Sequence, residues 1–175
     1  HKFVKNRLFS FESIIFVSPK INIKMKIQFE VLRISRDLVI KELEGLTLDQ
    51  IHAVPAGFKN SIAWNVAHLV VTQQLLHYKL SGLNCLCPDE LIEGYKKGTV
   101  PEKDFTEEEF DEVKDLFLGL PNTLEEDFEA GIFENYITYP TSTGLNIDSI
   151  ETALLFNNYH EGIHYGIIRS IKKFL

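Results

Sequence analysis

The stretch FNNYHEGIHYG, residues 156–166, places two histidines four positions apart. It lies in a segment that opens with Asp148 or Ser149, residues suited to cap a helix. In an α-helix, positions four apart lie on one face, one turn from each other. His160 and His164 are therefore predicted to form a chelating pair on the last helix.

Two other interpretations of this pair remain open. The histidines can be packing residues, provided that one imidazole stays neutral to avoid repulsion. The stretch His160-Glu161-Gly162-Ile163-His164 also fits the HExxH pattern of zinc proteases, in which the glutamate is a general base. Glycine is unusual inside a helix and no later helix supplies a third ligand, so the protease is the weaker interpretation.

Three earlier segments also have the apolar spacing of helices, namely 26–46, 61–81 and 106–128. Asn60 or Ser61 is placed to cap the second of them. These segments and the last helix predict an all-α fold, a four-helix bundle.

The third of these helices contains two local signals. Thr106 and Glu109 have the spacing of a capping box at its start, and Pro121 predicts a kink or a break. The preceding residues, 83–105, form a long connection with a short helix expected over 89–97. Such a crossover between the second and third helices fits two parallel neighbours.

Residues 130–146 come between the third and fourth helices. Tyr136 to Tyr139 suit an extended segment, while Pro140 and Gly144 suit a turn. This composition favours a short hairpin or an ordered loop before the last helix.

Helical geometry also sorts the histidines of the second helix. His68 lies one turn after Trp64, whereas His77, nine positions further, points to the opposite side. Only one of these two faces the core. His68 is the candidate third ligand, although a single core histidine is more often an ordinary hydrogen-bonding residue. His52 falls in a connection.

Composition limits the classes of function. The 175 residues fit one domain, predicted over 25–175 and starting at the only methionine, with residues 1–24 as an appendage. The net charge of -7 disfavours nucleic acid, and no stretch is apolar enough for a membrane helix. Cys85 and Cys87 are too close for an ordinary disulfide, so free thiols in a cytoplasmic protein are expected.

The chain resembles the DinB-like superfamily of metal-binding four-helix bundles. Three stretches carry the resemblance, in the expected order: Trp64-Asn65-Val66-Ala67-His68, Tyr139-Pro140-Thr141 to Gly144, and residues 156–166. Together with the helix order, it covers about residues 25–175. The resemblance implies that His68, His160 and His164 hold nickel, zinc or a similar divalent ion at one end of the bundle, in a pocket open to solvent.

The resemblance also implies frequent homodimers and, in some members, chemistry that uses a low-molecular-weight thiol, such as bacillithiol S-transfer. Other members have no assigned reaction. Relatives often carry glutamine where this chain has Ile167, which weakens any transfer of substrate recognition. A direct role in DNA repair is not implied.

Three further residues are candidates near the ion. Asn157 shares the face of the two histidines and is a candidate to orient an imidazole or bind water. Glu161, about 100° away, is either an acceptor for a ligand or a surface charge. Trp64 is a candidate wall of the pocket, although packing is its main expected role.

The leading functional hypothesis is a metal-dependent enzyme. Its three-histidine site activates a thiol or water against a small electrophile, as a transferase or a hydrolase. The alternative is a non-catalytic bundle that binds metal or another protein.

Overall fold

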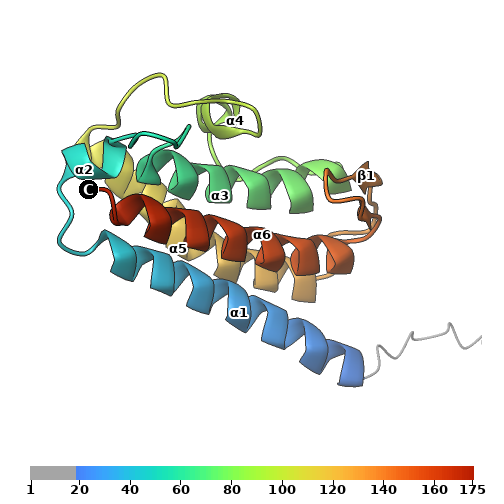
Figure 1. Ribbon diagram of the computed structural model, residues 1–175. Helices are drawn as coiled ribbons and strands as arrows, with labels where there is room; N and C mark the ends of the chain where they lie inside the picture. The colour runs from blue at the N-terminus through green and yellow to red at the C-terminus, as the bar shows by residue number, and fades with distance from the viewer. Residues whose placement is uncertain (1–18) are drawn as a thin grey trace, which may run out of the picture.

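Four long helices make up the bundle in the computed structural model, which describes the backbone of residues 19–175 and the side-chain surroundings of residues 25–175. They are α1 (Pro19–Leu43), α3 (Ile62–His77), α5 (Glu107–Glu129) and α6 (Ile150–Lys172) (Figure 1). The connections contain α2 (Leu48–His52), the 3₁₀ turn η1 (Lys79–Ser81), α4 (Asp89–Tyr95) and an antiparallel hairpin of β1 (Tyr139–Pro140) and β2 (Asn146–Ile147). The predicted all-α fold and the short hairpin are confirmed.

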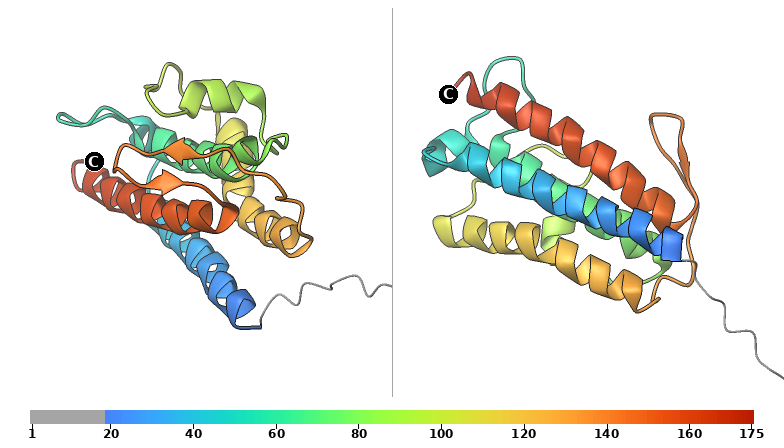
Figure 2. Two further views of the ribbon diagram at one scale, coloured as in Figure 1. Left: turned by 90° about the vertical axis from the view of Figure 1, so that its right-hand side faces the viewer. Right: turned by 90° about the horizontal axis from the view of Figure 1, so that it is seen from below.

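The long helices lie side by side in two directions (Figure 1). Helices α3 and α5 run one way, and α1 and α6 run the other way. The crossover from α3 to α5 carries α4 over the outside of α3, as the turned view shows (Figure 2). The long connection therefore joins two parallel helices, as its length predicted.

Side-chain caps begin three of the helices where the sequence placed them. Ser61 accepts a hydrogen bond from the Trp64 amide at the start of α3. Thr106 and Glu109 form a reciprocal capping box on α5, and Ser149 caps α6. Each cap pairs an amide that has no partner within its helix, and so fixes where the helix begins.

Three local features differ from the expectation. Helix α1 begins at Pro19 rather than at Lys26, where the sequence placed its start. Residues 1–18 of the predicted appendage lie outside the described residues, and the domain boundary before Met25 stays a prediction. The connection after α1 contains α2, opened by a capping box of Thr47 and Gln50 that the sequence interpretation missed. Helix α5 continues through Pro121, so the break does not occur.

The buried guanidinium of Arg36 accounts for part of the tolerance for Pro121. Proline has no amide hydrogen, so the Phe117 carbonyl, four residues earlier, loses its usual helical partner. Arg36 on α1 donates to that carbonyl at 2.6 Å and stacks over the Phe117 ring at 4.5 Å. A long-range contact thus supplies the hydrogen bond that the local sequence removes.

Helix α3 is the centre of the bundle. Fourteen of its sixteen residues are buried, because α5, α6 and α4 surround it. A helix that is apolar on nearly every side has to be covered in this way. In the described part of the chain, no helix is both long and apolar enough to cross a membrane.

Candidate metal centre

Three histidines from two helices meet between α3 and α6. His68, His160 and His164 each offer a ring nitrogen, and these atoms all lie within 4.8 Å of one another. The ring centroids are 4.4 Å apart for His160 and His164, 4.8 Å for His68 and His164, and 5.2 Å for His68 and His160. All three lie within helices rather than at helix ends, so the resemblance-based placement at the end of the bundle is only approximate.

The ring of His68 is fixed from two sides. Its Nδ1 lies 2.6 Å from the Tyr95 carbonyl oxygen, which can only accept, so Nδ1 carries the hydrogen and Nε2 keeps its lone pair. Trp64 stacks on the imidazole at 4.5 Å, but it is buried and is not among the residues that line the pocket beside the cluster, so it packs rather than walls the pocket. The indole NH of Trp64 in turn donates to Thr99 in the crossover.

A second acceptor sets the orientation of His164. Its Nδ1 lies 2.7 Å from Asn65 Oδ1. Asn65 donates its amide group to the Ser61 carbonyl, so its oxygen is the atom left to accept from His164. His164 therefore presents an unprotonated Nε2, the state in which imidazole binds a metal.

His160 is the third histidine of the cluster, and its ring has a different environment from those of His68 and His164. Its Nδ1 is buried and has no hydrogen-bond partner among the described residues. A buried ring nitrogen without a partner is unfavourable, so it needs a ligand, an ion or a water. This observation fits a group bound between the three rings.

Burial keeps all three imidazoles uncharged at neutral pH. Desolvation lowers the pKa of His68. Desolvation first, and then the neighbouring histidines, lower the pKa of His160 to about 3 and that of His164 to about 2. Neutral imidazole is the form that zinc and other borderline divalent ions accept, and three such ligands leave a coordination position open.

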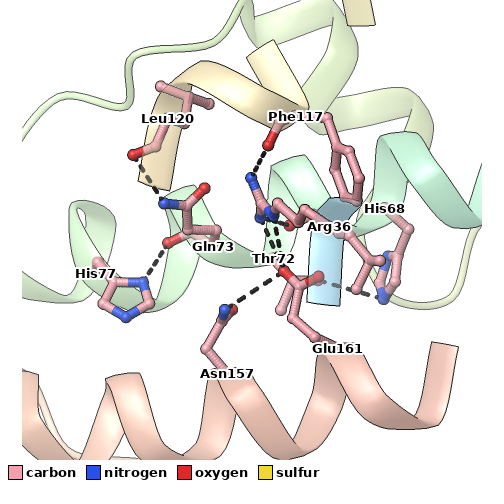
Figure 3. Close-up of polar contacts among 10 residues, drawn as sticks. Arg36, His68, Thr72, Gln73, His77, Phe117, Leu120, Asn157 and Glu161 are labelled. Atoms are coloured by element: carbon pink, nitrogen blue, oxygen red, sulfur yellow. Dashed lines mark hydrogen bonds and ion pairs between the residues drawn. The ribbon is translucent and has the colours of Figure 1, made fainter. Parts of the chain in front are cut away.

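Glu161 and Asn157 are fully buried, so Glu161 is not the surface charge that the sequence left open. Figure 3 shows Glu161 between the Arg36 guanidinium and Asn157. Glu161 Oε1 accepts from Arg36 Nη2 at 2.8 Å, and both side chains are fully buried. Asn157 Nδ2 is 3.5 Å from the same oxygen. Burial raises the pKa of Glu161, while Arg36 and Asn157 oppose that rise. Their predicted catalytic roles remain predictions.

The other histidines and the cysteines lie elsewhere. His77 points away from the cluster, as predicted, and its Nδ1 donates to the Gln73 carbonyl. The expectation that only one of His68 and His77 faces the core was wrong, because both side chains are buried. His52 ends α2, with Nδ1 3.4 Å from Asp104. Cys85 and Cys87 are free thiols, and burial raises the pKa of both, that of Cys87 to about 11.

Sequence reasoning missed two supporting residues. Asn65 was part of the quoted stretch but received no role, although a polar residue three positions before His68 signals a contact near the same end of α3. Arg36 was not identified as a candidate, because no pattern near it in the sequence indicates that its side chain is fully buried. Its partner is 125 residues away.

The fold and the three-histidine cluster define a helical bundle protein with a candidate metal site. The family model described as the DinB superfamily matches residues 32–168, which covers all three histidines. The chain belongs to the DinB superfamily. A comparison with curated proteins finds no match.

Proposed function

We propose that the protein is a metal-dependent enzyme in which His68, His160 and His164 hold one zinc or nickel ion. The proposal rests chiefly on the meeting of the three ring nitrogens within 4.8 Å. A bound divalent ion lowers the pKa of a thiol or water and so supplies a nucleophile for a small electrophilic substrate. A low-molecular-weight thiol is the favoured nucleophile for a transferase, and water for a hydrolase.

The surrounding residues support this role by preparing the ligands. Tyr95 and Asn65 hold the hydrogens of His68 and His164 on Nδ1. Thr72, one turn after His68, donates its hydroxyl to His68 Nε2 at 3.3 Å, a contact that an ion at Nε2 would replace, and it also lines a pocket beside the cluster. In this proposal Glu161 and Asn157 position other residues of the site and do not react themselves, because the Glu161 carboxylate is already paired with Arg36.

Elemental analysis tests metal binding directly. Protein purified without added metal is expected to contain one zinc or nickel ion per chain, and His164→Ala is expected to lose most of it. His77→Asn is a matched control, since His77 is a buried histidine on α3 outside the cluster. Equal metal content in wild type and His164→Ala would contradict the proposed site.

Spectroscopy of the cobalt(II) protein separates the two nucleophiles. If a thiol binds the ion, adding the thiol produces a thiolate-to-cobalt absorption band that His160→Ala lacks. Turnover of an electrophile that consumes the thiol then supports a transferase. Hydrolysis without thiol, also lost in His160→Ala, supports a hydrolase. Stoichiometric metal without either activity favours the non-catalytic alternative.

A role in protein association has separate support from an apolar outer face. Helix α1 packs along α6, and both expose apolar side chains at helical spacing: Ile27, Val31, Ile34, Leu38, Leu155, Tyr159 and Ile163. Gly162 and Gly166 lie on α6 beside this face with open space around them, which permits close approach of another helix. We propose that a second copy of this chain covers the face.

Sedimentation analysis tests the homodimer. Ile34→Glu combined with Tyr159→Glu is expected to give a monomer, since a buried unpaired carboxylate disfavours association. Leu118→Glu, a comparable change on the exposed side of α5, is expected to leave the dimer intact. A monomeric wild type would contradict the proposal.

A further inference from the structure

A pocket of about 480 Å³ opens beside the three histidines. This volume is in the range of small-molecule sites. Its lining comes from α3, η1, the part of the crossover just after α4, the hairpin and α6, and it includes His68, His160 and His164. The histidines are therefore one part of a larger wall.

The rest of that wall is mostly apolar. Leu75, Leu76 and Leu80 lie along α3 and η1, and Phe156 lies one turn before His160 on α6. These side chains favour a ligand with an apolar chain or ring, because its burial removes apolar surface from water.

The only charged residues in the lining are Lys79 and Lys97, and no carboxylate lines the pocket. This is unusual in a chain with a net charge of -7. Within residues 25–175, neither lysine takes part in an ion pair, although Lys26, Lys96, Lys103, Lys114 and Lys172 do. Both ammonium groups are thus available to a ligand.

We propose that the pocket selects an organic carboxylate with an apolar body. Lys79 and Lys97 bind the carboxylate, and the apolar body packs on the leucines and Phe156. The idea that the other end of this ligand reacts at the histidines rests on the proposed function. The preference for a carboxylate over a neutral ligand depends on the two lysines alone.

Both lysine side chains are exposed, so an ammonium–carboxylate contact forms at the open rim of the pocket, where salt weakens it. An ammonium group at the rim also discriminates against a neutral ligand of the same shape, and no acidic residue of the lining competes for it.

The test compares 4-phenylbutyrate with 4-phenylbutanol, which share a carbon skeleton and differ in charge. Calorimetry on the full zinc-treated chain is expected to show tighter binding of the carboxylate. Lys79→Gln combined with Lys97→Gln is expected to reduce that preference about tenfold, the effect of losing a charge-assisted contact. Lys59→Gln combined with Lys173→Gln, a double change of exposed lysines outside the pocket, keeps the preference.

Two results would overturn the inference. One is a carboxylate preference that survives in the Lys79/Lys97 double variant but disappears in His164→Ala, which places the carboxylate at the ion. The other is an absence of any preference in the wild type. The comparison of wild type with the Lys79/Lys97 double variant gives the same result whether or not zinc binds. Metal content is measured separately, so a failure of the metal proposal can be told apart from a failure of the carboxylate proposal.

Discussion

Arg36 shows how much a single buried residue can organise. Its guanidinium bonds the Glu161 carboxylate, the Phe117 carbonyl and, at 3.4 Å, the Leu69 carbonyl. It therefore ties α1 to α5, α3 and α6 in the core. Such a group is costly to bury unless every partner is present, so the network is sensitive to the loss of any one member.

Replacing Arg36 tests this dependence. Arg36→Met is expected to lower the free energy of unfolding by about 3 to 5 kcal/mol, because Glu161 is left buried without its partner. Adding Glu161→Gln is expected to recover part of the loss. Arg33→Met is the control, since its partner Glu125 is partly exposed, and should cost at most about 1 kcal/mol. Urea unfolding measures all of these variants, and equal losses for both arginines would contradict this account.

His77 predicts a dependence of stability on pH. Burial, with a smaller contribution from Arg36, lowers the pKa of His77 to about 4. The unfolded chain therefore binds a proton that the folded chain excludes once the pH falls below about 6.5, so stability falls with pH. Between pH 7 and pH 5 this residue accounts for about 2 kcal/mol of the loss.

The matched measurement is urea unfolding of wild type and His77→Asn at both pH values. Asparagine has no titrating ring, so the difference between pH 7 and pH 5 is expected to shrink by about 2 kcal/mol. An unchanged difference would show that the folded protein accepts the proton at position 77.

At the scale of the elements, helix ends are set by local chemistry. Helix α5 begins with three acidic residues after Thr106, where the helix dipole favours negative charge. The Thr106 hydroxyl accepts from the Glu109 amide, and the Glu109 carboxylate accepts from the Thr106 amide. The latter bond and Lys103 lower the pKa of Glu109. Such a box acts without help from distant residues.

The cap of α5 can be tested by two substitutions at one position. Thr106→Ala removes the hydroxyl and is expected to cost about 1 kcal/mol of stability. Thr106→Ser retains the hydroxyl and is expected to remain within a few tenths of a kcal/mol of wild type. If both variants unfold at the same urea concentration, the hydroxyl does not stabilise the helix start.

At the scale of the whole molecule, an ion held by His68, His160 and His164 would join α3 to α6. An ion that binds only the folded state stabilises it by about 2.7 kcal/mol at a concentration 100 times its dissociation constant. Zinc is therefore expected to raise the melting temperature of the wild type, and chelator to reverse the change. His164→Ala should show no such response, while His77→Asn should respond like the wild type. A response in His164→Ala would place the ion elsewhere.

The sequence was informative for most signals that act within a few residues, with the capping box of Thr47 and Gln50 as the exception. Ser61, Thr106 and Ser149 act on amides three positions away, so the helix starts were predictable. The pairing of His160 with His164 follows from helix geometry in the same way. The continuity of α5 at Pro121 was not predictable, because Arg36 lies 81 residues from the carbonyl that it pairs.

The sequence by itself determined the four long helices, the caps of α3, α5 and α6, and which two histidines could chelate, because these depend on spacing along one helix. Only the tertiary structure decided that His68 meets the pair, that Asn65 and Tyr95 orient the rings, and that two lysines border the pocket. These contacts join separate helices and loops. Their geometry arises from packing the apolar faces of the bundle, which no local spacing encodes.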